Sequence, residues 1–256
     1  MKWLPSIFKI ERSHIRATAA TNAGYVRLTN QDAYCLNSSA DVWAVADGMG
    51  GHHDGERASE LIVKAFEAIP YESTFATRLN LAHAAIATAN RAIFDEAQEN
   101  GRQMGSTIVA LVTGEDRYAI LWAGDSRAYL KRGDAITLLT RDHSQAQEMV
   151  AAGVLGADMV TGHASSHVLV RAVGVQPEVD VDQVEGALYD QDMFLLCSDG
   201  LHNLVSEVEM LKTMTLWEFN RVSEQLVFIG LERGAPDNIT VCVVSFGRDL
   251  SGSFQQ

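Results

Sequence analysis

The sequence predicts a single α+β domain in which amphipathic helices pack against antiparallel β-sheet. Two long helical patterns come first along the chain, and a series of short apolar strands separated by tight turns follows them. The chain has 256 residues, 47% hydrophobic and 21% charged, which suffices for one globular domain with a substantial core. We expect a short leader (1–15), a domain over 16–248 and a frayed tail (249–256).

The two helical segments carry apolar residues at steps of three and four. The first is predicted from Gly55 to Ile69, with Asp54 as its N-cap. The second is predicted from Phe75 to Gln98, with Gly101 as its terminator. Each helix should therefore place one face on a shared core.

Seven short segments, rich in β-branched or aromatic residues, are predicted to be strands. They are DVWAVA, STIVALVT, RYAILWA, RAYLKR, AITLLT, MFLLC and ITVCVVSF. The turns between Ser106 and Thr140 are too short for parallel crossovers, so consecutive antiparallel strands are expected there. The weaker pattern from Gln145 to His167 predicts a short helix followed by a surface loop, a suitable place for a substrate lid.

The composition narrows the classes of partner. The formal net charge of −13 argues against binding the nucleic-acid backbone. Apolar runs are too short for a membrane span. The cysteines Cys35, Cys197 and Cys242 lie far apart without CxxC spacing, which is typical of buried free thiols in a reducing cytoplasm.

Four aspartates stand where an apolar strand meets a turn: Asp47, Asp125, Asp199 and Asp237. Each alone is more often a turn-capping residue than a ligand, because its side chain accepts backbone hydrogen bonds. Four carboxylates at strand ends of one domain would repel each other unless cations held them. Oxygen ligands without thiolates favour Mg²⁺ or Mn²⁺, and a pair of ions about 3.5–4 Å apart activates water for attack on phosphorus.

Six sequence strings occur in the order of the signature motifs of one enzyme family. They are RLTNQDAY, VADGMGG, GSTIVALV, WAGDSRAYL, LLCSDGL and APDNITVCVV. From about Tyr25 to Phe246 the chain resembles the type 2C metal-dependent protein phosphatases, particularly bacterial ones. The resemblance implies a four-layer α-β-β-α sandwich, with two central antiparallel sheets flanked by helices and the metals at one end.

The resemblance also implies roles for the aspartates. Asp47 would bridge two Mn²⁺ or Mg²⁺ ions, and the Gly48 carbonyl would bind the second ion. Asp199 and Asp237 would bind the first ion. Asp125, together with Asp199, would bind a third ion.

Residues around this centre receive supporting roles from the same resemblance. Arg27 would hold the substrate phosphate through its fork of donors. Asp32 would lie in the outer shell of the second ion and orient the waters bound to it, and Asn238 would also lie in the outer shell of the metals.

Two positions depart from the pattern of animal and plant relatives. Gln31 replaces a glutamate, which predicts weaker binding of the second metal. Met49 replaces a histidine that is a proposed general acid. The proton for the leaving group would then come from a metal-bound water, His52 or His53.

The implied activity is hydrolysis of phosphoserine and phosphothreonine in proteins by direct attack of water, opposing a serine/threonine kinase. We expect a cytoplasmic monomer. The alternative is a catalytically silent regulatory or scaffold module of the same fold. Cys242 and Arg248 have the Cys-x5-Arg spacing of cysteine-dependent phosphatases, but the residues between them are strand-like and form no phosphate cradle.

Overall fold

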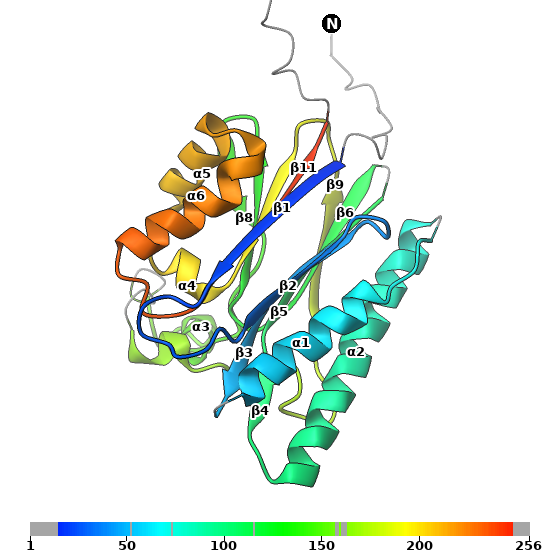
Figure 1. Cartoon of the computed structure of the whole chain (residues 1–256), viewed down its shortest axis with the longest axis vertical. Helices are drawn as coiled ribbons and strands as arrows, with labels where there is room; N and C mark the ends of the chain where they lie inside the picture. The colour runs from blue at the N-terminus through cyan, green and yellow to red at the C-terminus, as the bar shows by residue number, and fades with distance from the viewer. Residues whose placement is uncertain are drawn as a thin grey trace, which may run out of the picture.

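Two antiparallel sheets lie face to face between two layers of helices in the computed structural model, which describes residues 15–51, 53–72, 74–114, 116–156, 159 and 163–247 (Figure 1). This arrangement confirms the predicted α-β-β-α sandwich. The predicted leader, except for Ile15, and the predicted tail lie outside the described residues, as do His52 and Arg248.

The first sheet has five strands and joins both ends of the described chain. Its order is β1 (Ile15–Asn22), β11 (Ile239–Phe246), β10 (Met193–Cys197), β7 (Arg127–Arg132) and β8 (Ala135–Leu138). Every neighbouring pair is antiparallel.

The second sheet has six strands, also with antiparallel pairs throughout. Its main order is β2 (Asp32–Asn37), β3 (Val42–Gly50), β5 (Ile108–Thr113), β6 (Arg117–Ala123) and β9 (Asp182–Ala187), and β4 (Met104–Ser106) pairs with the end of β3.

Helices cover the outer faces of both sheets. The pair α1 (Asp54–Glu67) and α2 (Phe75–Asn100) lies on one side of the molecule, and α5 (Glu207–Leu216) and α6 (Phe219–Glu232) lie on the other (Figure 1). The one-turn α4 (Asp199–His202) follows β10 directly. In the predicted lid region, α3 (Gln145–Ala151) and a 3-10 turn, η3 (Ala164–His167), are formed. No described helix is long and apolar enough to cross a bilayer.

Three buried apolar clusters separate the four layers. One lies between α1, α2 and the six-stranded sheet, with Phe66 and Ile86 at its centre. The second fills the space between the sheets around Trp43 and Phe194. The third lies under α5 and α6, around Leu226. All three described cysteines are free and buried, as predicted.

The helix predictions are confirmed in extent and corrected at one end. The second helix starts at Phe75 and ends against Gly101, which has a left-handed φ of 62°. Asp54 is the first residue of α1 and not its N-cap; that position belongs to His53, whose side chain makes no capping bond. The Asp54 carboxylate instead binds Arg102, at 3.1 Å.

The strand predictions need one topological correction. β5 and β6 form the expected antiparallel pair, as do β7 and β8, but β6 and β7 belong to different sheets. Asp125 therefore does not lie in a hairpin turn. It lies where the chain crosses from one sheet to the other, because β6 continues its pairing with β9 and β7 with β10.

Candidate metal centre

The strand register brings the predicted aspartates to one end of the sandwich. In the five-stranded sheet, Cys197 pairs with Val241 and with Arg127. The residues just beyond those pairs are Asp199, Asp237 and Asp125, which therefore share an edge. In the six-stranded sheet, Asp32 pairs directly with Asp47.

Asp47 is held by hydroxyl and amide groups of the segment between β4 and β5. Its N–H donates to Thr107 Oγ1 at 3.0 Å, and its carbonyl accepts from the Thr107 N–H at 2.8 Å and from Ser106 Oγ at 3.0 Å. Contrary to the prediction, Asp47 is not in a turn after a strand, since β3 continues to Gly50. These bonds fix the backbone that aims the carboxylate.

Asp32 is buried opposite Asp47 on the neighbouring strand. Its Oδ2 accepts a hydrogen bond from Ser198 Oγ at 2.7 Å, while its Oδ1 is buried without a hydrogen-bond partner among the described residues. Burial raises the pKa of Asp32 to about 7. Two carboxylates opposite each other on antiparallel strands repel unless positive charge lies between them.

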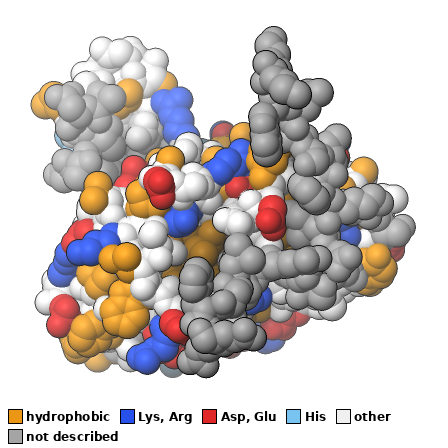
Figure 2. Space-filling model, turned by 90° about the horizontal axis from the view of Figure 1, so that it is seen from above, with side chains coloured by type: hydrophobic (Ala, Val, Ile, Leu, Met, Phe, Trp, Pro, Cys, Tyr) orange, Lys and Arg blue, Asp and Glu red, His pale blue; other side chains and the backbone are white. Residues whose placement is uncertain are grey.

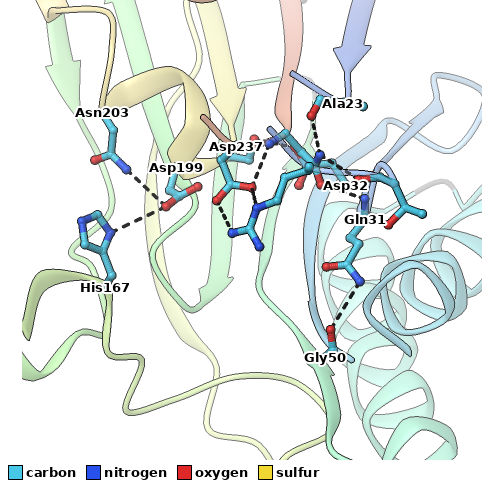
Figure 3. Close-up of polar contacts among 12 residues, drawn as sticks. Ala23, Gln31, Asp32, Gly50, His167, Asp199, Asn203 and Asp237 are labelled. Carbon is cyan, nitrogen blue, oxygen red and sulfur yellow. Dashed lines mark hydrogen bonds and ion pairs between the residues drawn. The ribbon is translucent and has the colours of Figure 1, made fainter. Parts of the chain in front are cut away.

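Asp199 and Asp125 complete the acidic lining. Asp199, the first residue of α4, accepts a hydrogen bond from Asn203 Nδ2 at 3.2 Å, and His167 Nδ1 lies 3.9 Å from its Oδ2 (Figure 3). Asp125 is 8% exposed, and burial followed by repulsion from Asp199 raises its pKa to about 7. Burial and the Asp237 charge likewise raise the pKa of Asp199.

Asp47 experiences the sum of these charges. Burial raises its pKa well above the ordinary value, and the carboxylates of Asp32, Asp199, Asp125 and Asp237 raise it further, in that order. A group in this environment is either protonated or neutralised by cations. Hard oxygen donors of this number fit Mg²⁺ or Mn²⁺ in the donor chemistry that they offer.

Asp237 faces Arg27 across the mouth of the site. Arg27 Nε and Nη2 donate to the two carboxylate oxygens at 2.8 and 2.7 Å (Figure 3). The pKa of Arg27 is raised chiefly by this hydrogen bond. In the described part of the chain, no three Asp, Glu, His or Cys side chains are gathered closely enough to form a metal cage. Ion binding would require Arg27 to release Asp237.

Asn238 joins the loop that carries Arg27 to the start of β11. Its Nδ2 donates to the carbonyls of Ala23 and Thr29 at 2.9 and 3.0 Å, and its Oδ1 accepts from the Gln31 N–H at 2.8 Å (Figure 3). Asn238 thus braces the 23–31 loop, and its predicted place in the outer shell of the metals stays a prediction.

A cleft of about 2040 Å³ opens over these groups. Its lining includes seven of the eight predicted site residues: Arg27, Asp47, Gly48, Asp125, Asp199, Asp237 and Asn238. Asp32 lies behind them, buried against Ser198. Met49 and His53 also line the cleft, but His53 is bound to Glu56, at 3.1 Å. His167, in the predicted lid region, lies 3.9 Å from Asp199.

The opposite end of the sandwich is seen from above in Figure 2. Where side chains are described on that face, Lys and Arg are interspersed with Asp and Glu.

Several residues of the site were not predicted from the sequence. Ser106, Thr107 and Ser198 hold the aspartates through hydroxyl groups, and Asn203 and His167 contact Asp199 directly. Ser198 and Thr107 do flank recognisable motifs, SDG and GST, and that adjacency was the available clue.

Comparison with known proteins places the chain in one family. Residues 22–228 match the model of the family described as protein phosphatase 2C. The chain belongs to this family of metal-dependent protein serine/threonine phosphatases.

Named relatives share much of the sequence. The serine/threonine phosphatase stp of Listeria innocua is 33% identical over 93% of this chain and 100% of its own length. PstP, a serine/threonine protein phosphatase of Mycobacterium tuberculosis, is 31% identical over 90% of this chain, which spans only 44% of PstP.

Solved structures agree with the fold. PppA, described as a key regulatory component of T6SS in Pseudomonas aeruginosa, superposes with a TM-score of 0.86 at 35% identity, covering 93% of this chain and all of PppA. A catalytic domain of PstP in complex with two manganese ions gives a TM-score of 0.79 at 30% identity, covering 91% of this chain and 99% of that domain.

Proposed function

We propose that this chain hydrolyses phosphoserine and phosphothreonine in proteins, using water activated at a centre of two Mn²⁺ or Mg²⁺ ions. The observation that carries the proposal is the position of Asp47, which lines the cleft together with Asp125, Asp199 and Asp237, and whose pKa these three carboxylates and Asp32 raise. The PstP domain with two manganese ions supports the same metal requirement. The proposed catalytic domain covers residues 16–248.

The chain's own residues would divide the work as follows. Asp47 and the Gly48 carbonyl, with Asp199 and Asp237, would hold the ions. Arg27 would turn from Asp237 to the substrate phosphate, a bidentate partner of the same geometry as a carboxylate. When bound, the ions supply a water of lowered pKa as nucleophile and offset the charge of the phosphate.

No covalent phosphoenzyme is part of this proposal. Cys242, the residue with the misleading Cys-x5-Arg spacing, is fully buried in β11, and burial raises the pKa of its thiol. A buried neutral thiol cannot reach a phosphoprotein in the cleft. Water is therefore the proposed nucleophile.

We extend the proposal to a third ion at Asp125 and to a cytoplasmic, monomeric enzyme that opposes a serine/threonine kinase. Asp125 supports a third ion because it is buried beside Asp199 and repelled by it. The kinase, the location and the monomeric state follow from the resemblance and the free cysteines.

Hydrolysis of p-nitrophenyl phosphate and of a phosphothreonine peptide tests the activity. We expect turnover to require Mn²⁺ or Mg²⁺ and to fall by about a hundredfold or more in Asp47→Asn, because the carboxylate shared by both ions is lost. Asp134→Asn is the matched control, since Asp134 is an exposed aspartate in the β7–β8 turn.

The scaffold alternative predicts a different result. If the wild-type protein stays inactive in excess Mn²⁺ and binds a partner equally well as Asp47→Asn, the chain is a silent module of the fold. PppA is described as a regulatory component, but that description belongs to PppA.

A further inference from the structure

The segment that carries Asp125 lies between the two sheets and lacks strand pairing of its own. It crosses from β6 to β7 through Gly124, which has a φ of +116°. A Cβ on Gly124 would stand 2.6 Å from the Thr107 side chain, so only glycine fits. The position of the Asp125 carboxylate therefore depends on contacts from other parts of the chain.

His143 holds this crossing from one side. Its ring Nδ1 accepts a hydrogen bond from the Gly124 N–H at 3.1 Å. The backbone N–H of His143 donates to the Gly124 carbonyl at 2.9 Å. Its Nε2 lies 3.2 Å from Asp182 Oδ2 and 3.3 Å from Arg171 Nη1. Trp122 stacks on the ring with an interplanar angle of 15°. The imidazole is thus fixed in orientation.

His202, at the end of α4, holds the crossing from the other side. Its Nε2 lies 3.0 Å from the Asp125 carbonyl oxygen, which can only accept, so Nε2 must donate. Its Nδ1 is buried and has no hydrogen-bond partner among the described residues. Burying a nitrogen without a hydrogen-bond partner lowers the stability of the fold, a cost that a leucine at the same position would not carry. The bond to Asp125 is the contact that offsets this cost.

We propose that His143 and His202 are positioning residues that fix the peptide groups on either side of Asp125 and so determine where its carboxylate can hold a divalent cation. This inference rests on the proposed metal-dependent function. Neither ring is proposed to touch the cation or the substrate: the His143 ring acts through the Gly124 N–H and the His202 ring through the Asp125 carbonyl. Side chains in such outer positions commonly change metal affinity without being ligands.

Matched pairs of variants separate the hydrogen bonds from mere packing. His202→Gln keeps an N–H donor near the Nε2 position, whereas His202→Leu fills similar space without one. His143→Asn keeps an acceptor at the Nδ1 position, whereas His143→Leu does not. Asp125→Asn marks the ion site itself.

The measurement is a titration of the full chain with Mn²⁺ alone by isothermal calorimetry. We expect both leucine variants to weaken the site that Asp125→Asn removes by about tenfold or more. The remaining sites should keep their affinity within about twofold, since their ligands stay in place. His202→Gln and His143→Asn should recover most of the loss.

The proposal is overturned if the leucine variants bind Mn²⁺ as the wild type does, or if Asp125→Asn removes no site. Thermal melting without metal shows whether each variant folds. If His202→Leu does not fold, His202→Asn replaces it, because that shorter amide cannot reach the Asp125 carbonyl. Phosphatase activity of the wild type is measured separately. An inactive wild type would refute the proposed function, while the comparison of Mn²⁺ affinities would still decide whether His143 and His202 position Asp125.

Discussion

Arg27 contacts Asp237, which we propose as a metal ligand, and is itself the proposed phosphate-binding residue. Its side chain is 55% exposed and makes a bidentate hydrogen-bonded pair with Asp237. A phosphate group can take the place of the carboxylate in such a pair. We expect Arg27→Ala to raise KM for a phosphothreonine peptide by about tenfold, because a charged hydrogen-bond pair is lost. Arg27→Lys should recover only part of it, since an ammonium cannot form the fork.

Steady-state kinetics in saturating Mn²⁺ provide the measurement. Arg91→Ala is the control, because Arg91 is an exposed arginine paired with Asp95 on α2, on the outside of the molecule. An unchanged KM in Arg27→Ala would remove Arg27 from phosphate binding.

At this scale the sequence predicts the acidic residues better than their supports. Asp125, Asp199 and Asp237 are recognisable because each adjoins an apolar strand, whose end defines a position at the sheet edge. Thr107 and Ser198 cannot be recognised from the sequence. Their hydroxyl groups support an aspartate only because the strand register places them within hydrogen-bond distance of its side chain or backbone. The contact of Arg27 with Asp237 likewise joins residues 210 positions apart.

The approach of β3 to the start of α1 sets the geometry of the Asp47–Gly48 segment. A Cβ on Gly48 would lie 1.9 Å from the Gly55 carbonyl oxygen, a distance that demands backbone movement. We expect Gly48→Ala to destabilise the fold by about 1–3 kcal/mol or more and to lower activity, because strand and helix must separate.

Thermal melting and turnover of the same preparation test this. Gly51→Ala is the control, since a Cβ at Gly51 meets nothing within 4 Å. Equal melting temperatures for the two variants would show that the close contact at Gly48 does not contribute to the stability of the fold.

Among whole elements, the central strands, the edge strand β8 and the two long helices could be predicted, whereas the edge strands β1, β2 and β9 could not. β10 and β11 are apolar on both faces, because helices cover one side and the other sheet covers the other, so their runs stand out. The edge strands β1, β2 and β9 are partly exposed and carry mixed sequences such as DQVEGA. The weak apolar contrast of α5 similarly hid that helix.

For the molecule as a whole, the buried acidic cluster links metal binding to stability. Asp32 and Asp125 have pKa values raised to about 7 in the fold, whereas unfolded aspartates titrate near 4. Between about pH 4 and 7 these carboxyl groups hold more protons in the folded state than in the unfolded one. His202, whose pKa burial lowers to about 4, contributes in the opposite direction, but the raised carboxyl groups outnumber it. We expect the metal-free protein to lose stability as pH rises through this range and Mn²⁺ to remove that loss.

Calorimetric melts from pH 5 to 8, in chelator and in excess Mn²⁺, measure the effect. In chelator Asp47→Asn should melt higher than the wild type near neutral pH, because one member of the repelling set is gone, and Asp134→Asn should not. A metal-free melting temperature that rises from pH 5 to 7 would contradict this description of the cluster.

The layered architecture could be predicted from the sequence, but the point at which the chain passes from one sheet to the other could not. Short turns predict that β5, β6, β7 and β8 follow one another, yet the chain changes sheets at Asp125. Local turn length does not distinguish a hairpin from a crossing of this kind. The choice depends on the partners β9 and β10, which lie more than fifty residues further along.

Anomalous diffraction at the manganese edge, from crystals grown in MnCl₂, tests the central claim most directly. The account predicts two strong peaks in the cleft, both next to Asp47, with Asp199 and Asp237 at the first ion and Arg27 turned away from Asp237. Peaks absent from this cleft, with Arg27 still bound to Asp237 at saturating Mn²⁺, would contradict it.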